Sequence, residues 1–434
     1  FIDMIPGARV QATIELLDEI AGTRTPADHL VGNYFRSRRY AGSKDRRAVS
    51  EMVYSILRRR GEYAWRSGGE DSRHLILAHL MAEGGAEHDA VAGLFSGEKF
   101  CPTGLEDDEQ KSLAKLAQPD ADDVPAWVTG NYPEWLQESL QRRFGADLAV
   151  EMAAMLGRAE VDLRVNDLQS NMERVMAVLE KEEIPVTPGA LAPTALRLDS
   201  RRSLTNHPLY QSGAIEIQDE GSQLVSLLCT AQPGQMVVDY CAGAGGKSLA
   251  MAAKMANKGQ IFALDKNPRR LRPLRDRLQR AGARNIQVHA LADPAAKAVL
   301  AEQIGKTDRV LLDVPCSGSG AWRRNPESKW RFSEEEFAGY CVTQGEILRQ
   351  SAPLVKPGGR LIYATCSILM EENEDQIESF LGEHPEFEIV PIGEVWDEVM
   401  ETPCPAEDDY LRLTPAQNST DGFFVAVLQR REAG

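Results

Sequence analysis

Apolar positions recur at helical spacing through the first hundred residues of the chain. The segments 8–20, 45–60 and 73–83 each place hydrophobic side chains on one face of a helix. A polar stretch containing Pro and several Asp residues follows them. The pattern predicts an all-helical domain over residues 1–105 and an acidic linker over residues 106–125.

Residues 126–205 mix two kinds of pattern. Amphipathic helices are predicted at 135–145 and 171–184, and strands at 161–167 and 195–199. The mixture predicts a small α+β domain.

Residues 206–434 alternate short apolar runs with amphipathic segments, such as the expected helices at 247–255 and 268–282. This alternation is typical of a mostly parallel sheet with helices on both faces. The fold class predicted for this region is therefore α/β with a Rossmann-like sheet. The expected strands are 236–240, 261–265, 286–290, 309–313, 360–365 and 422–429.

Composition excludes several classes of protein. The chain has no run of 18 apolar residues, so we predict no transmembrane helix and no membrane partner. Its N-terminus soon becomes polar and makes a poor signal peptide. The seven cysteines form no CxxC pair, which argues against a disulfide framework, a zinc knuckle or another metal site. A reducing, cytoplasmic location fits this cysteine usage best.

Charge complicates a nucleic-acid function. The net charge of −16 repels phosphate at long range. Two local runs, 36–47 and 323–331, are nevertheless strongly basic, while 370–375 is one of several acidic runs. Taken alone, each basic run is more typical of a solvated face than of an RNA site.

A glycine-rich turn follows the first expected strand of the α/β region. Asp239 ends the strand, and Gly243, Gly245 and Gly246 lie in the turn before the next helix. Glycines let the backbone approach a ligand, so the turn could serve NAD, another nucleotide or S-adenosylmethionine. A P-loop is excluded because Tyr240 stands where its first glycine is required.

Carboxylates follow the next three strands as well. Asp265 ends the second strand, Asp293 follows the third and Asp313 ends the fourth. An acid about 20 residues beyond the glycine turn commonly binds ribose hydroxyls. Any one of these acids could be a turn or N-cap residue, but the series favours a ligand site at the carboxyl ends of the strands.

Two cysteines, Cys316 and Cys366, follow the fourth and fifth strands and should face the same crevice. A cysteine beside a cofactor turn is a candidate nucleophile. Methylation of cytosine at C5 needs a thiolate that adds to C6, an acid near N3 and a group that assists release. Asp313 could supply the acid, and Lys247 is a candidate cation that favours the thiolate.

The motifs that carry this chemistry also carry a family resemblance. In order they are IQDEGSQLVSLL (217–228), DYCAGAGGKS, DVPCSGSGAWRRNPESKW, LVKPGGRLIYATCS and TDGFFVA, preceded by PEWLQESLQRRFG and LRVN. The chain resembles the RsmB (Fmu) type of S-adenosylmethionine-dependent RNA 5-methylcytosine methyltransferases, within the NOP2/NSUN family. The resemblance implies a Rossmann-like methyltransferase sheet, a small α+β domain before it and an N-terminal all-helical, NusB-like domain.

The resemblance also implies roles for individual residues. Cys366 would be the C6 nucleophile, Cys316 would assist release of the methylated base, and Asp313 would interact with N3. Gly243 and Ala244 stand where family members often have Ala and Pro, so we expect a looser turn. The implied cofactor-binding residues are Cys241, Ala242, Gly243, Ala244, Gly245, Gly246, Lys247, Asp265, Asp293 and Asp313.

The implied partner is RNA, and we expect a monomer. Small-subunit ribosomal RNA is the predicted substrate and tRNA the alternative. Arg323 by resemblance, and Arg36, Arg38 and Arg39 by charge, are the predicted RNA contacts. Three other activities stay open: DNA cytosine methylation with Cys316 as nucleophile, methylation of a protein or small molecule without either cysteine, and RNA binding without catalysis.

Overall fold

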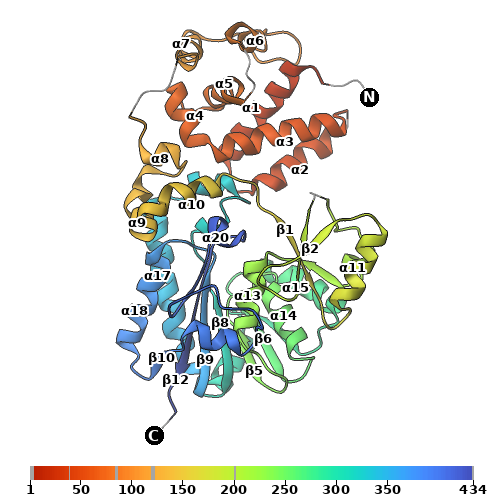
Figure 1. Ribbon diagram of the computed structural model, residues 1–434, viewed down its shortest axis with the longest axis vertical. Helices are drawn as coiled ribbons and strands as arrows, with labels where there is room; N and C mark the ends of the chain where they lie inside the picture. Colours follow the sequence, from red (N-terminus) through yellow and green to blue (C-terminus); the bar gives the residue numbers. More distant parts are fainter. Residues whose placement is uncertain (1–3, 39, 84–86, 119–122, 200–201, 433–434) are drawn as a thin grey trace. The chain divides into compact units, whose positions relative to one another are not determined.

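The chain divides into two compact units (Figure 1). The first unit comprises residues 1–158 and 321–333, and the second comprises residues 159–320 and 334–434. Residues 126–158, predicted to open the α+β domain, thus belong to the first unit. The computed structural model describes residues 4–38, 40–83, 87–118, 123–199 and 202–432.

The first unit is helical, as the apolar spacing predicted. Leu16, Val53, Ile56 and Ile76 are among its fully buried side chains, contributed by helices α1, α3 and α5. The predicted helix at 45–60 is α3 followed directly by α4. The helices are α1 (Pro6–Gly22), α2 (Ala27–Ser37), α3 (Ser43–Arg58), α4 (Arg60–Ser67), α5 (Ser72–Glu83), α6 (His88–Ala92), α7 (Asp107–Leu116), α8 (Ala126–Thr129), α9 (Gln137–Phe144) and α10 (Leu148–Met155).

Helix α7 corrects the prediction of an acidic linker over residues 106–125. Glu106 and Glu109 form a capping box that satisfies backbone N–H groups at the start of the helix. Leu113 and Leu116 are buried in the helical core. The acids at 106–109 therefore belong to the start of an amphipathic helix, whereas residues 119–122 of the predicted linker lie outside the described residues.

Residues 321–333, which follow the Pro-Cys motif in the chain, fold as part of the helical unit. The ammonium of Lys329 is buried and donates to the backbone carbonyls of Arg58 (3.2 Å) and Asn131 (2.8 Å). The indole N–H of Trp330 donates to a backbone carbonyl of α3 at 3.0 Å. Lys329 and Trp330, in the second half of the basic run 323–331, therefore bind other parts of the protein and do not form a solvated face.

The buried Lys329 predicts a pH-dependent stability. Burial, with a further contribution from the Arg58 guanidinium, lowers the pKa of Lys329 to about 7. An unfolded lysine keeps its proton up to about pH 10, so between these values the unfolded chain binds more protons and stability rises with pH. Relative to K329M, the wild-type free energy of unfolding should rise by up to about 1.4 kcal/mol per pH unit above pH 7. Urea unfolding of both proteins across this range tests it, and a pH-independent difference would contradict it.

The second unit begins with a four-stranded antiparallel sheet in the order β2-β3-β1-β4. Two of its strands, β1 and β3, confirm the predictions at 161–167 and 195–199. Strand β4 lies beyond the predicted boundary at residue 205 and completes this sheet by pairing with β1. Its elements are β1 (Val161–Val165), α11 (Met172–Lys181), β2 (Val186–Pro188), β3 (Ala195–Leu198), α12 (Pro208–Gln211) and β4 (Ile215–Ile217).

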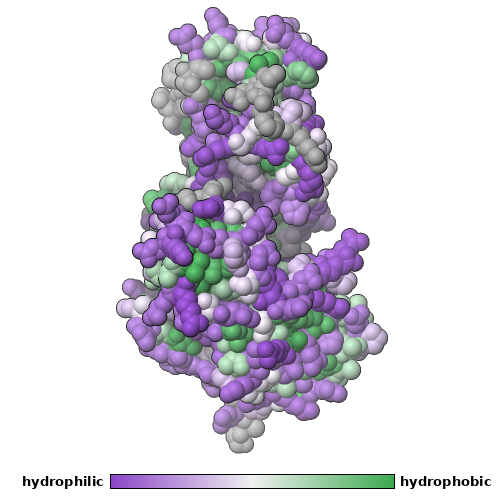
Figure 2. Space-filling view, turned by 90° about the vertical axis from the view of Figure 1, so that its right-hand side faces the viewer, coloured by the Kyte–Doolittle hydropathy of each residue, from purple (hydrophilic) through white to green (hydrophobic). Residues whose placement is uncertain are grey.

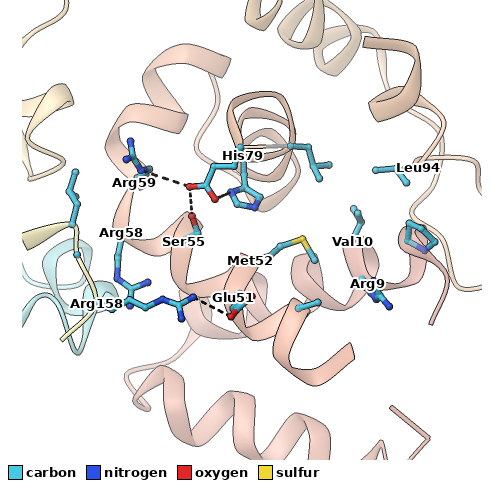
Figure 3. Close-up of a pocket in the computed structure, with 16 residues that line it drawn as sticks. Arg9, Val10, Glu51, Met52, Ser55, Arg58, Arg59, His79, Leu94 and Arg158 are labelled. Carbon is cyan, nitrogen blue, oxygen red and sulfur yellow. Dashed lines mark hydrogen bonds and ion pairs between the residues drawn. The ribbon is translucent and has the colours of Figure 1, made fainter. Parts of the chain in front are cut away.

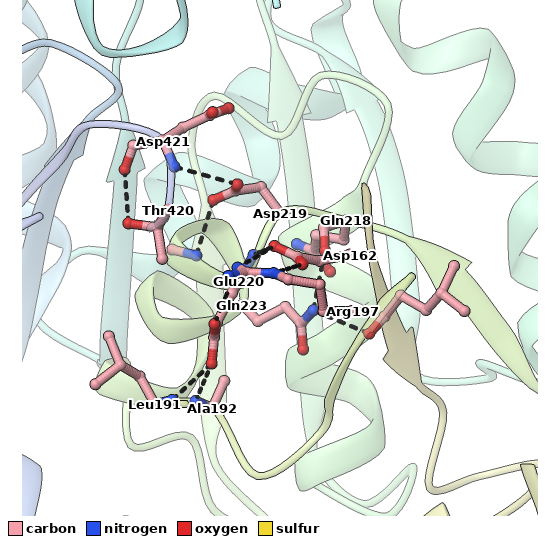
Figure 4. Close-up of polar contacts among 12 residues, drawn as sticks. Asp162, Leu191, Ala192, Arg197, Gln218, Asp219, Glu220, Gln223, Thr420 and Asp421 are labelled. Carbon is pink, nitrogen blue, oxygen red and sulfur yellow. Dashed lines mark hydrogen bonds and ion pairs between the residues drawn. The ribbon is translucent and has the colours of Figure 1, made fainter. Parts of the chain in front are cut away.

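A buried polar network joins this sheet to helix α13 (Glu220–Leu228) (Figure 4). The Glu220 carboxylate accepts hydrogen bonds from the backbone N–H groups of Leu191 (2.6 Å) and Ala192 (2.8 Å). Arg197 donates to Asp162 at 2.8 Å and lies 3.4 Å from Glu220. Each buried charge in the network has a partner, so the network is stable inside the protein. Because Glu220 is the first residue of α13, these contacts fix the position at which the helix begins.

The main sheet has the order β10-β12-β9-β8-β5-β6-β7, with β11 paired to β12. Strands β9, β8, β5, β6 and β7 are parallel, and β12 runs antiparallel to β9. All six strands predicted in this region are confirmed. They are β5 (Met236–Asp239), β6 (Gln260–Asp265), β7 (Ile286–Ala290), β8 (Thr307–Asp313), β9 (Val355–Thr365) and β12 (Phe423–Arg430). Two short strands that were not predicted, β10 (Phe387–Ile389) and β11 (Leu411–Leu413), complete the sheet.

Helices cover both faces of this sheet, because the buried strands are apolar on both sides. Val237 and Ile362 belong to the core shared with α13, α14 and α19, whereas Val238 and Tyr363 belong to the core shared with α16, α17 and α18. No helix in the described residues is long and apolar enough to cross a membrane. Hydrophilic residues cover most of the face in Figure 2. The remaining helices are α14 (Gly246–Lys254), α15 (Pro268–Ala281), α16 (Pro294–Gln303), α17 (Glu334–Ser351), α18 (Glu374–Glu383), α19 (Ile392–Asp397) and α20 (Pro415–Asn418).

Candidate active site

The glycine turn joins the carboxyl end of β5 to the start of α14. Gly245 has φ +80°, and a Cβ there would lie 2.1 Å from the Leu274 side chain. Gly243 has φ +53°, a conformation that disfavours the alanine common in the family. The departure at Gly243 therefore suits the backbone of this turn. The first N–H groups of α14 have no intrahelical acceptor and are available at the turn.

Two buried carboxylates flank the turn. Asp265 is 3% exposed and accepts hydrogen bonds from the N–H groups of Gly243 (3.0 Å) and Asn267 (2.7 Å). Asp239 accepts from the Ser248 hydroxyl at 2.6 Å, but its other oxygen has no hydrogen-bond partner among the described residues. Burial raises the pKa of Asp239 to about 7. The turn thus holds an orphaned buried acceptor that a bound cation or donor would satisfy.

Lys247 and Asp313 form an ion pair between the turn and the end of β8. The ammonium nitrogen lies 2.7 Å from a carboxylate oxygen, and the two side chains are 12% and 31% exposed. Burial opposes the charge on Lys247, but the attraction of Asp313 outweighs it, so the pKa of Lys247 is raised. The structure thus brings two of the predicted site residues into direct contact.

The two cysteines meet because β8 and β9 are parallel neighbours. Asp313 is in register with Ala364, so the Pro-Cys loop and the Thr-Cys-Ser loop leave the same edge of the sheet side by side. The Sγ atoms of Cys316 and Cys366 lie 3.5 Å apart, and both residues are partly exposed. The hydrogen bond with Cys366, together with burial, raises the pKa of Cys316 well above its usual value.

Glu372 holds the Pro-Cys loop, and sequence reasoning missed it. It is fully buried, and its carboxylate accepts from the Ser317 N–H (2.8 Å), the Ser317 hydroxyl (2.6 Å) and the Gln344 amide (3.0 Å). Gln344 also donates to the carbonyl of Pro315 at 3.0 Å. The residue lies in the acidic run 370–375, which suggested a surface. Its position six residues after Cys366 was the only local signal available.

The predicted RNA contacts all belong to the first unit. Arg38 pairs with Glu15 at 3.3 Å inside the helical unit, and Arg36 is exposed. Arg39 lies outside the described residues. Arg323 is only 5% exposed, so its guanidinium offers little surface to a ligand in this structure. RNA contact by these four residues stays a prediction.

Asp293 stays a prediction as well. It is exposed at the N-cap position of α16, and its side chain makes no capping hydrogen bond. Its place after β7 puts it at the carboxyl edge of the sheet, as predicted.

A cavity of about 710 Å³ lies in the helical unit, and none of the predicted catalytic residues lines it (Figure 3). Two of its lining arginines are neutralised by acids: Arg158 lies 3.4 Å from Glu51, and Arg59 lies 4.0 Å from Glu83. His79 also approaches Glu83, at 3.8 Å. The pairing of cations with acids weakens any attraction for an anion, and we assign no ligand to this cavity.

The order of the main sheet reverses direction between β5 and β8, the switch point at which parallel α/β sheets bind ligands. The glycine turn, the carboxylate at the end of β6 and the paired cysteines all lie at the carboxyl ends of these strands. Fold and site together define a Rossmann-like methyltransferase.

Comparison with known proteins specifies the family. Residues 226–429 match the family described as 16S rRNA methyltransferase RsmB/F, and residues 132–205 match its ferredoxin-like domain. The chain is 33% identical over 304 residues to the probable ribosomal RNA small subunit methyltransferase B of Synechocystis sp., a match that covers 69% of this chain and 67% of that protein. The chain belongs to the RsmB/F methyltransferase family.

Two further likenesses agree with this. The chain is 33% identical over 303 residues to the probable ribosomal RNA small subunit methyltransferase B of Bacillus subtilis, covering 69% of this chain and 67% of the relative. The crystal structure of PH0851 matches 98% of this chain and 99% of its own length, with a TM-score of 0.78 and 27% identity. That match includes the helical unit as well as the sheet.

The methyl donor of this family is S-adenosylmethionine. The residues present fit it, because the cofactor is cationic at its sulfonium and ammonium groups and the site is lined by Asp239, Asp265 and Asp313. The unsatisfied oxygen of Asp239 and the free N–H groups at the start of α14 provide both acceptors and donors near the turn.

Proposed function

We propose that the protein methylates C5 of a cytosine in small-subunit ribosomal RNA through a thiolate adduct at C6. The observation that carries the proposal is the meeting of two thiols, 3.5 Å apart, on the edge of the sheet that also bears the Lys247–Asp313 ion pair. A methyltransferase acting on an already nucleophilic atom would need neither thiol.

In the proposed reaction the Cys366 thiolate forms a bond to C6 of the cytosine. Negative charge then builds on the ring at N3, where the Lys247–Asp313 pair can supply a proton and accept a hydrogen bond from the resulting N3–H. C5 becomes enamine-like and nucleophilic. S-adenosylmethionine, when bound, supplies the electrophilic methyl group. After methyl transfer the C5 proton passes to a base such as water, and N3 returns its proton to the Lys247–Asp313 pair. The Cys366 thiolate then leaves as the C5–C6 double bond reforms, and Cys316 assists this release.

The environment of the cysteines supports this division of roles. The raised pKa of Cys316 disfavours its thiolate, so Cys366 is the better candidate for the attacking nucleophile. The Lys247 ammonium lies within electrostatic reach of Cys366. Attack on C6 requires the thiolate, which is the nucleophilic form of a cysteine.

The names of the relatives support an RNA substrate. Both curated relatives are described as acting on the small ribosomal subunit. The target base must leave its stack to reach the thiols, and unstacking costs less in an RNA loop or bulge than in a helix.

Incubation with labelled S-adenosylmethionine and unmodified small-subunit ribosomal RNA, with tRNA in parallel, tests the proposal. We expect label as 5-methylcytosine in the ribosomal RNA. Label confined to tRNA would retain the chemistry and overturn the substrate. Methylation at another atom would overturn the chemistry.

Asp265 is proposed to hold the ribose of the cofactor. Its two oxygens already accept backbone N–H groups, and their remaining lone pairs can accept ribose hydroxyls. Asp265→Ala should weaken S-adenosylmethionine binding by about 30-fold to 150-fold, since charged hydrogen bonds contribute about 2–3 kcal/mol. Calorimetric titration measures this, with the exposed Asp276→Ala as control. Equal affinity in Asp265→Ala and wild type would show that the ribose lies elsewhere.

A further inference from the structure

Helix α15 carries an unusual concentration of arginine for a protein of net charge −16. Residues 268–281 contain six arginines and a single acid, Asp276. The helix follows directly after β6 and Asp265, so its first turn lies at the carboxyl edge of the sheet (Figure 1). This composition requires an explanation, because acidic residues outnumber basic residues in the chain as a whole.

The structure divides these arginines into two sets. Arg277 and Arg280 pair with the buried carboxylate of Glu216 on β4, at 2.9 and 2.6 Å. Arg277 also donates to the carbonyl of Ala244 in the glycine turn, at 2.7 Å. These two side chains are structural, because they attach the small sheet to α15 and brace the turn.

The other set is exposed and without protein partners. The side chains of Lys266, Arg269, Arg272 and Arg275 make no ion pair or hydrogen bond within the described part of the chain. Most arginines of the helical unit, by contrast, are paired, as in Arg9 with Asp45 and Arg38 with Glu15. The cations on α15 are therefore free to bind an external anion.

Their spacing makes a continuous strip. Arg269, Arg272 and Arg275 are three residues apart, so they fall on one face of the helix with a rise of about 4.5 Å between neighbours. The opposite face buries Leu271 and Leu274 in the sheet core. The strip starts at the edge that carries the site and runs along α15 away from it.

The strip is continuous with the site through Arg270. Its guanidinium lies 3.6 Å from Asp265, and a Cβ on Gly243 would lie 3.1 Å from it. An elongated polyanion whose reacting base lies near the turn would place its neighbouring backbone over this helix. Arginine suits phosphate because its planar fork donates two parallel hydrogen bonds.

We propose that Lys266, Arg269, Arg272 and Arg275 form a phosphate-binding strip that holds the RNA backbone beside the target cytosine. The inference rests on the proposed RNA substrate and names the surface that grips it. The net negative charge of the protein repels RNA at long range, whereas the cations of the strip attract RNA phosphates locally. Binding through such cations depends steeply on salt concentration.

The test measures RNA binding of the full chain against salt. In R269Q/R272Q/R275Q, the slope of log Kd against log[KCl] for transcribed small-subunit ribosomal RNA should fall by about 2–3, since each phosphate contact contributes about 0.7–0.9. Affinity near physiological salt should fall about tenfold or more. S-adenosylmethionine binding should be unchanged.

Two further variants distinguish an effect of these particular cations from an effect of the net charge of the protein. R269K/R272K/R275K keeps the cations and should keep the slope. K258Q/R284Q/K306Q removes three exposed cations that precede β6, β7 and β8 at the opposite edge of the sheet, and should also keep it. An unchanged slope in R269Q/R272Q/R275Q, or an equal loss in K258Q/R284Q/K306Q, would overturn the strip.

The outcomes also separate this inference from the proposed function. A wild-type protein that forms 5-methylcytosine while the glutamine variant keeps its salt slope overturns the strip alone. A strip-dependent slope without formation of 5-methylcytosine supports the strip and overturns the chemistry. Loss of binding to anionic lipid vesicles, with RNA binding intact, would assign the cations to a membrane surface and overturn the proposal.

Discussion

Cys366→Ala is expected to abolish methyl transfer to RNA, with a loss of at least about a thousandfold in the single-turnover rate. Without the thiolate adduct at C6, C5 of cytosine is too electron-poor to accept the methyl group. Cys316→Ala should behave differently and accumulate a covalent complex between protein and RNA. In that variant the adduct forms, but the group that assists release is missing.

Denaturing gel electrophoresis of each variant with labelled RNA distinguishes the two outcomes. Cys404→Ala is the matched control, because this cysteine is partly exposed and lies in the segment between α19 and β11 rather than in the β8 or β9 loop. The reverse pattern, with Cys316→Ala inactive and free of adduct while Cys366→Ala stays active, would make Cys316 the nucleophile. Full activity in both variants would remove thiol chemistry altogether.

Glu372→Ala is expected to cost both stability and activity. The change removes the shared acceptor of the partly buried N–H and hydroxyl of Ser317 and of the Gln344 amide, which keeps the Pro315 carbonyl as its other acceptor. Each unsatisfied buried group costs about 1–3 kcal/mol, so a loss of several kcal/mol is expected. The neighbouring Cys316 loses its fixed position, and kcat should fall while the affinity for S-adenosylmethionine is retained.

Glu372→Gln separates positioning from general destabilisation. Its amide oxygen can still accept from the Ser317 N–H and from Gln344, and its NH₂ can donate to the Ser317 hydroxyl, which reverses its role. We therefore expect Gln to restore most of the activity and of the thermal midpoint. The positioning role is wrong if Glu372→Ala keeps the wild-type kcat, or if Gln restores the midpoint without restoring kcat.

The strands of the catalytic sheet could be predicted because their signal is local. Runs such as 261–265 and 309–313 are apolar at consecutive positions, as strands buried on both faces must be. The short strands β4, β10 and β11 were missed, because three residues carry too little pattern and form only against a neighbouring strand. The helix α7 was missed because acids on its solvent face resemble those of a linker.

The site divides in the same way. The common location of Asp265, Asp313, Cys316 and Cys366 could be predicted, because each lies at or just after the carboxyl end of a strand and parallel strands bring these ends to one edge. Glu372 could not, because its burial depends on partners 55 and 28 residues away in the sequence. The basic run 323–331 was predicted to be a solvated face for the same reason. Lys329 in this run is buried, and its hydrogen-bond acceptors lie far away in the sequence, at Arg58 and Asn131.

The sequence by itself determined the order of strands, turns and reactive residues, and hence the class of chemistry. Local spacing suffices for this, because a strand end, a glycine turn and a cysteine are adjacent in the chain. Only the tertiary structure decided which charged side chains form ion pairs within the protein and which are exposed to solvent. The arginines of α15 show why: Arg277 and Arg280 are neutralised by Glu216, more than 60 residues earlier, whereas Arg269, Arg272 and Arg275 on the same helix have no partner among the described residues.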